Sequence, residues 1–166
     1  VATTLNNVAL LLQKTGDLAE ARRLHERALA IRERALGPDH PGVAGTLGNL
    51  SVVCRLSGDT AGGLAAQRRA HAIVEAAYGA DSPHAAKTLY GLAAQLYAQG
   101  ALDEARPAFL RSLERTASHA RSQLAAAAWA TRTGRPVASA GTRPAARIHA
   151  GTVRVARKHG LARFAP

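Results

Sequence analysis

A repeat of 42 residues constrains this chain more than any other feature of its sequence. Residues 1–42 and 43–84 are identical at 17 positions, and residues 85–116 match the first 32 positions of the repeat at 12 of them. Self-similarity at a fixed period indicates that one structural unit is built several times and that neighbouring units stack on one another. We therefore expect three units, at residues 1–42, 43–84 and 85–116.

Each unit has the sequence pattern of two helices. In its first half, apolar or small side chains recur at offsets of 3, 4 and 7 residues, which places them on one face of an α-helix. In the first unit these residues are Leu5, Val8, Ala9 and Leu12. A glycine at the same position of every unit should end this helix in a left-handed conformation, and a second helix rich in small residues follows. The three glycines are Gly16, Gly58 and Gly100.

The segments between units contain signals that end one helix and begin the next. Two glycines are expected to end the second helices, and two prolines to lie in the first turn of the helix that follows, where a missing N–H group costs nothing. Two aspartates are expected to cap that helix. These residues are Gly37 and Gly79, Pro41 and Pro83, and Asp39 and Asp81.

Four segments of the first unit together resemble the tetratricopeptide repeat, in the 42-residue variety found in kinesin light chains and in many bacterial signalling proteins. They are Thr4–Leu12, Gly16–Ala21, Ala28–Arg32 and Leu36–Pro41. The resemblance extends over residues 1–116 and is weakest in unit two, whose second helix contains Gly62, Gly63 and Gln67. Because glycine inside a helix costs about 0.5–1 kcal/mol relative to alanine, we expect unit two to be the softest part of the array.

The resemblance implies an all-α fold, a right-handed α-α superhelix of antiparallel helix pairs whose first helices line a concave groove. It also implies a protein–protein interaction scaffold that binds a peptide or protein segment in this groove. Mapped onto this sequence, the candidate ligand-binding side chains are Asn6, Asn7, Lys14, Asn49, Arg55, Lys87, Tyr90 and Tyr97.

These residue types suit an extended peptide. An asparagine amide both donates and accepts hydrogen bonds, as a peptide backbone does, and tyrosine offers a flat surface with a polar tip. Lysine and arginine attract carboxylates, so we expect a protein or peptide partner with an acidic or carboxylate feature. The family pattern would place a third asparagine where this chain has Gly91. The C-terminal end of the groove therefore departs from the family.

The sequence offers no set of residues for catalysis, for a metal or for a cofactor. The seven histidines form neither an H-x-x-x-H pair nor an HExxH motif. The single cysteine, Cys54, excludes an internal disulfide and falls on the apolar stripe of its helix, where we expect it to be buried. We expect a protein that is not an enzyme and that holds no cofactor and no metal.

Positive charge is concentrated at the C-terminal end. Residues 1–116 carry 13 Lys+Arg and 11 Asp+Glu, whereas residues 117–166 carry 9 Lys+Arg and no acid, so most of the formal net charge of +11 lies in the last 50 residues. Residues 117–135 are expected to form a capping helix or a degenerate fourth unit in which Trp129 docks. Residues 136–166 read as a basic, flexible tail or, from Pro144 to Gly160, as one more short basic helix.

The sequence leaves other functions open. The repeats equally suit the sensor or oligomerisation arm of a larger bacterial signalling ATPase or regulator, and the open ends of the stack suit self-association. Contact between the basic tail and nucleic acid is the least favoured alternative, because the tail has almost no aromatic residues to stack on bases. The helical pattern already runs at Val1, which indicates a piece of a longer protein. The lack of a long apolar run and of paired cysteines predicts no membrane span and a cytoplasmic location.

Overall fold

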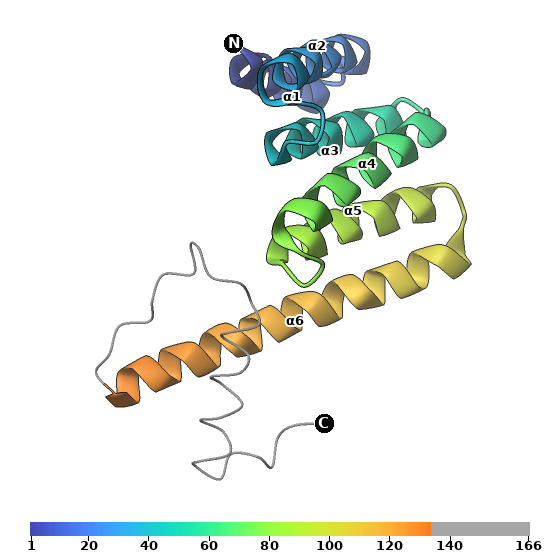
Figure 1. The fold of residues 1–166 in the computed structure, drawn as a ribbon. Coiled ribbons are helices and arrows are strands. Elements are labelled where there is room, and N and C mark those ends of the chain that lie inside the picture. Colours follow the sequence, from blue (N-terminus) through green and yellow to red (C-terminus); the bar gives the residue numbers. More distant parts are fainter. Residues whose placement is uncertain (134–166) are drawn as a thin grey trace. The chain divides into compact units, whose positions relative to one another are not determined.

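The computed structural model describes residues 1–133, and these residues form helices without any strand. Figure 1 shows the helices in the order of the sequence. The expected all-α fold is confirmed as a right-handed superhelix of antiparallel helix pairs. Residues 1–116 form one compact unit, which contains the repeats, and residue 117 begins the other. The helices are α1 (Ala2–Thr15), α2 (Leu18–Leu36), α3 (Pro41–Leu56), α4 (Thr60–Tyr78), α5 (Pro83–Ala98) and α6 (Leu102–Thr133).

Each repeat folds back on itself at a glycine, as the sequence predicts. The glycine between the first and second helix of every repeat has a positive φ, between 79° and 93°. A side chain is strained in this left-handed region, and glycine avoids that cost. The residues are Gly16, Gly58 and Gly100.

The caps between repeats differ from the expectation in one respect. The first helices α3 and α5 are capped by His40 and Ser82, not by the aspartates one position earlier. His40 Nδ1 accepts a hydrogen bond from the Gly42 N–H at 3.0 Å, and Ser82 Oγ accepts one from the Ala85 N–H at 3.1 Å. The residue directly before the proline has the extended backbone that a cap requires, so position 40 or 82 takes the role that we assigned to position 39 or 81.

The first helices approach one another more closely than the second helices do. The backbone of α3 comes close to both α1 and α5, whereas the backbones of α2 and α4 do not meet. Long side chains bridge α2 and α4 instead, as in the ion pair between Arg69 Nη1 and Glu33 Oε1 at 2.6 Å. The array of α1 to α5 therefore curves toward its first helices.

Small residues form the core where one repeat meets the next. Val53 of α3 is fully buried against Ala9 and Ala21, which belong to the two helices of the preceding repeat. A second cluster joins α3, α4 and the start of α5, with Leu29 of α2 packed against it. Each helix pair therefore buries much of its apolar surface on a neighbour, which makes the repeats stable only as a stack.

Helix α6 is longer than the second helix of the other repeats. Its first part, residues 102–116, belongs to the repeat unit, and residues 117–133 continue the same helix without a turn. No glycine or proline interrupts the sequence between Pro107 and Gly134, so nothing ends the helix where a fourth helix pair would begin. Trp129 is half-buried in this second part. The expected tail, residues 136–166, lies outside the described residues.

Candidate functional site

The candidate site is the exposed side of α1, α3 and α5, which we call the first-helix face. These helices contain three cationic Lys/Arg residues and no aspartate or glutamate. All 11 acidic residues of the chain lie on the second helices or in the connecting loops. The cationic residues on the three first helices are Lys14, Arg55 and Lys87.

No side chain of residues 1–133 neutralises these three cations. Lys14 and Lys87 are exposed and Arg55 is half-buried. Within residues 1–133 none of the three side chains makes a hydrogen bond or an ion pair, whereas on the second helices Arg69 and Arg115 each pair with a glutamate. An unpaired set of like charges leaves a positive potential along the face, which attracts negatively charged groups.

Two tyrosines extend the face along α5. The side chains of Tyr90 and Tyr97 are 59% and 65% exposed, which is unusual for residues of this size. The ring of Tyr90 meets Phe109 of α6 edge to face, with ring centroids 5.3 Å apart. This contact holds one side of the Tyr90 ring and leaves the other available to a ligand.

The asparagines are placed differently from the expectation. Asn6 is buried, and its amide oxygen accepts hydrogen bonds from His25 Nδ1 at 3.0 Å and from Asn49 Nδ2 at 3.1 Å. It therefore joins α1, α2 and α3 rather than facing a groove. Asn49 is half-buried by the same contact, and Asn7 alone is exposed with no side-chain hydrogen bond among the described residues.

His25 is a structural residue, and no sequence motif around it indicates this role. Its side chain is fully buried, and Nδ1 must carry the proton because it donates to an amide oxygen. Nε2 is buried and has no hydrogen-bond partner within the described residues, and burial lowers the pKa of the imidazole. The repeat does indicate that residue 25 faces the first helix of its unit. Residue 25 corresponds to Gln67 and Phe109, and both of these also face the first helix of their repeat.

Gln67 occupies the same position at the next junction and explains why the chain has Gly91. Its Oε1 accepts a hydrogen bond from Ser51 Oγ at 2.8 Å, and its Nε2 donates to the Thr88 carbonyl oxygen at 2.9 Å. A Cβ atom at position 91 would lie 2.4 Å from this Nε2. The side chain that the family pattern expects at 91 is thus replaced by the amide of Gln67, which reaches across from α4.

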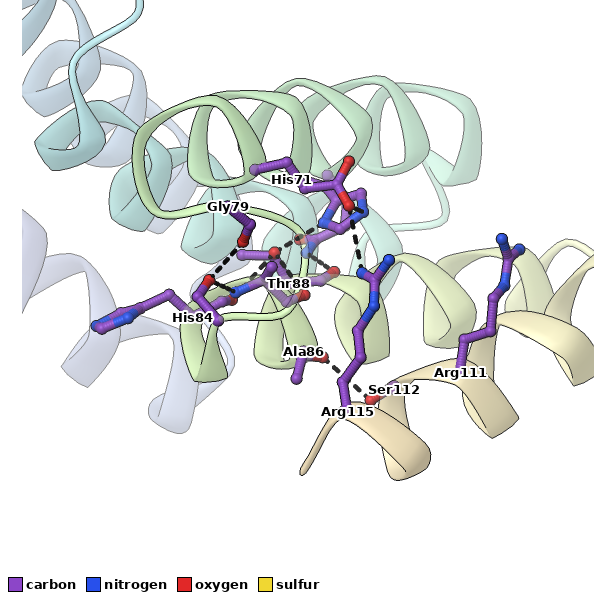
Figure 2. A network of polar contacts seen from close by, with 12 residues as sticks. His71, Gly79, His84, Ala86, Thr88, Arg111, Ser112 and Arg115 are labelled. Atoms are coloured by element: carbon purple, nitrogen blue, oxygen red, sulfur yellow. Dashed lines mark hydrogen bonds and ion pairs between the residues drawn. The ribbon is translucent and has the colours of Figure 1, made fainter. Parts of the chain in front are cut away.

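A further polar network fixes α4, α5 and α6 behind the face (Figure 2). His71 Nδ1 lies 2.9 Å from Thr88 Oγ1, and Glu75 Oε1 lies 3.5 Å from His71 Nε2 and 3.2 Å from Arg115 Nη1. Burial lowers the pKa of His71, while the charge of Glu75 opposes this shift. Ser112 Oγ donates to the Ala86 carbonyl oxygen at 3.0 Å, which ties α6 to α5. These contacts hold α5, the helix that carries Lys87 and Tyr90.

The described residues show no arrangement suited to metal binding or to a reactive thiol. Within residues 1–133, no group of three or more His, Cys, Asp or Glu side chains could hold a metal ion. Cys54 is buried as expected, and burial raises the pKa of its thiol, which keeps it protonated. In the same part of the chain no helix is both long and apolar enough to cross a bilayer.

Comparison with known proteins identifies the repeats and their fold. Families described as tetratricopeptide repeat match residues 1–62, 43–84 and 87–110. A single-residue variant of a Podosopora anserina protein with nearly identical TPR-like repeats, classed with kinesin light chains, has a similar structure, with a TM-score of 0.66 and 20% sequence identity. That match covers 72% of this chain and 57% of the other. The repeats without this substitution match with a TM-score of 0.64 and 20% identity, over 71% and 56% of the two chains. No curated protein sequence matches the chain.

Proposed function

The chain belongs to the tetratricopeptide-repeat family of protein-interaction scaffolds, and we propose that it binds an extended, acidic segment of a partner protein along the first-helix face. The fold is generally non-catalytic, and the residues on this face suit binding rather than chemistry. The observation that carries the proposal is the distribution of charge: α1, α3 and α5 carry no carboxylate, and their three cations have no partner within the part of the chain that the structure describes.

The charge pattern favours a ligand with carboxylates spread along its length. One cation stands on each first helix: Lys14 and Arg55 in the last turn of α1 and α3, and Lys87 near the start of α5. A segment that contacts all three therefore crosses the first helices obliquely. No protein carboxylate competes for them within the described residues. Contacts of this kind are each worth about 0.2–1 kcal/mol at an exposed surface, so three together support modest affinity that weakens as salt is added.

The remaining side chains of the face suit the backbone and apolar parts of the same ligand. Asn7 offers a free amide that can both donate to and accept from a peptide group. Tyr90 and Tyr97 offer exposed rings against which a ligand side chain can pack. The hydrogen bonds of Asn6 and Gln67 hold the first helices at fixed spacing, so a ligand does not have to order them.

A labelled peptide titration tests the proposal. The probe is a peptide of alternating alanine and glutamate, long enough to cross the three first helices, and its partner probe has glutamine in place of every glutamate. We expect the acidic peptide to bind the full chain at low salt and the glutamine peptide to bind much more weakly. Replacing the three cations together (Lys14→Gln, Arg55→Gln, Lys87→Gln) should reduce affinity about tenfold or more, in line with the loss of three surface ion pairs.

A matched control distinguishes binding at the first-helix face from binding that follows the net charge of the chain. Arg27, Arg34 and Arg111 are exposed arginines on the second helices, and replacing them with glutamine removes the same three charges. This control variant should bind the acidic peptide nearly as well as the natural chain does. Equal losses in the two triple variants would mean that binding follows overall charge, and the assignment of the face would be wrong.

We also propose that the protein is located in the cytoplasm. The one cysteine, Cys54, is buried as a free thiol, and the fold relies on no disulfide among the described residues. Such a chain suits a reducing compartment.

A further inference from the structure

Gln67 of α4 carries a buried carboxamide whose hydrogen-bonding capacity is only half used. A carboxamide offers two N–H donors and an oxygen with two lone pairs. Within residues 1–133, Oε1 accepts one hydrogen bond from Ser51 Oγ at 2.8 Å, and Nε2 donates one to the Thr88 carbonyl oxygen at 2.9 Å. The residue is 5% exposed, so one N–H and one lone pair are largely shielded from solvent and have no partner in that part of the chain.

The first helix of the second repeat places no side chain over this amide, in contrast to the other two repeats. In the first repeat the corresponding residue is His25, which donates to the amide oxygen of Asn6 at 3.0 Å. In the third it is Phe109, whose ring meets that of Tyr90 with centroids 5.3 Å apart. The residue of α3 that corresponds to Asn6 and Tyr90 is Gly48. Glycine thus stands where the other repeats place a covering side chain.

The neighbouring first helix also has a glycine beside the amide. A Cβ atom at Gly91 of α5 would lie 2.4 Å from Gln67 Nε2. On the side of α3, a Cβ atom at Gly48 would meet only Gln67 Oε1 beyond its own turn of helix, at 4.0 Å. Both glycines are half-buried, and the backbones of α3 and α5 come close to one another. The carboxamide of Gln67 therefore lies just beneath the first-helix face, between α3 and α5, with a glycine on either side.

A spare donor and a spare acceptor on one planar group match a second carboxamide. Two carboxamides pair when the N–H of each donates to the oxygen of the other. An asparagine side chain presents such a group on a single methylene, so it reaches the short distance beneath the face and loses little rotational freedom. A carboxylate accepts hydrogen bonds but donates none, and an apolar side chain does neither, so each would leave part of the Gln67 amide without a partner.

We propose that the bound acidic segment carries an asparagine whose side chain enters between Gly48 and Gly91 and pairs with the carboxamide of Gln67. This inference rests on the proposed function and adds one specific residue to the ligand. Exposed ion pairs tolerate a shift of the ligand along the face, because they are weak and screened. A shielded pair of hydrogen bonds does not, because a shift leaves both amides unsatisfied. Gln67 thereby fixes the register in which the segment binds.

Two peptides of equal length and charge test the contact in titrations of the full chain at low salt. One alternates asparagine with glutamate and the other alternates alanine with glutamate. The asparagine peptide should bind about tenfold more tightly, as expected for two added hydrogen bonds. Gly48→Asn supplies the carboxamide from the protein itself and should bring the two affinities close to equality. Gly45→Asn is the matched control one turn earlier in α3, where a Cβ atom has no neighbour within 4 Å, and it should keep the preference.

A second measurement on the natural chain needs no variant. The side-chain N–H signals of Gln67, followed by nuclear magnetic resonance, should move much further with the asparagine peptide than with the alanine peptide. Equal affinities of the natural chain for the two peptides, or a preference that survives Gly48→Asn, would overturn the contact at Gln67 and leave the first-helix face in place. Failure of both peptides to bind would refute the proposed function itself, and the asparagine contact with it.

Discussion

Replacing Gly91 with alanine should destabilise the protein, although alanine is the better helix former. Gly91 lies in α5, and a Cβ atom there would approach Nε2 of Gln67 to 2.4 Å, well inside van der Waals contact. The amide of Gln67 must then move away. It would lose its hydrogen bonds with the Ser51 hydroxyl, which is buried, and with the Thr88 carbonyl oxygen, which is partly buried.

The size of the effect follows from two opposing contributions. A buried polar group left without a partner costs about 1–3 kcal/mol, and the change disturbs two such bonds. Alanine regains about 1 kcal/mol over glycine inside a helix. The free energy of unfolding should therefore fall by about 1–5 kcal/mol. Equilibrium urea unfolding of the full chain, followed by far-UV circular dichroism, measures this difference.

Two further variants make the test specific to Gln67. Gly45→Ala is the same substitution in α3, at an exposed position where a Cβ atom has no neighbour within 4 Å, and it should stabilise by about 0.5–1 kcal/mol. In a Gln67→Ala background, Gly91→Ala should also become stabilising, because the side chain that it displaces is gone. Stabilisation of the natural chain by Gly91→Ala as large as that by Gly45→Ala would contradict the role assigned to Gln67.

Further predictions concern the buried polar contacts. His25 and His71 have pKa values lowered from 6.5 by burial, so the unfolded chain binds more protons than the folded one at mildly acidic pH. The stability that they contribute should be complete above about pH 6.5 and decline as pH falls below it, and the double variant His25→Gln, His71→Leu should flatten this dependence in urea unfolding at about pH 7.5, 6.0 and 5.0. Ser112→Ala should lower the unfolding free energy by about 0.5–1.5 kcal/mol through loss of the bond to the Ala86 carbonyl oxygen. An unchanged urea midpoint for Ser112→Ala would contradict that role.

The fold could be predicted from the sequence because its signals are local and recur. The apolar spacing of the first helices and the glycines at 16, 58 and 100 each act within a few residues, and three copies of the pattern confirm one another. The caps were misassigned by one position because aspartate is a strong capping residue in general, whereas the proline that follows makes His40 or Ser82 the extended residue.

The site was less predictable because its buried polar contacts join different repeats. Asn6 and Asn7 are neighbours in sequence, yet one bonds to α2 and α3 and the other faces solvent. A periodicity of 42 residues places Asn7 and Asn49 in corresponding positions but does not reveal that Asn49 reaches back to Asn6. Likewise, Gln67 was read as an eroded position, and only its contacts across to α5 explain the glycine at 91.

The assignment of the first-helix face depends most on where an acidic ligand touches the protein. Amide and side-chain chemical shifts of the isotopically labelled chain, recorded by nuclear magnetic resonance during titration with the alanine–glutamate peptide, locate that contact directly. The largest shifts should fall on α1, α3 and α5, around Lys14, Arg55, Lys87 and the two exposed tyrosines. Shifts concentrated on α2 and α4, or on residues 134–166, would contradict the assignment of the first-helix face.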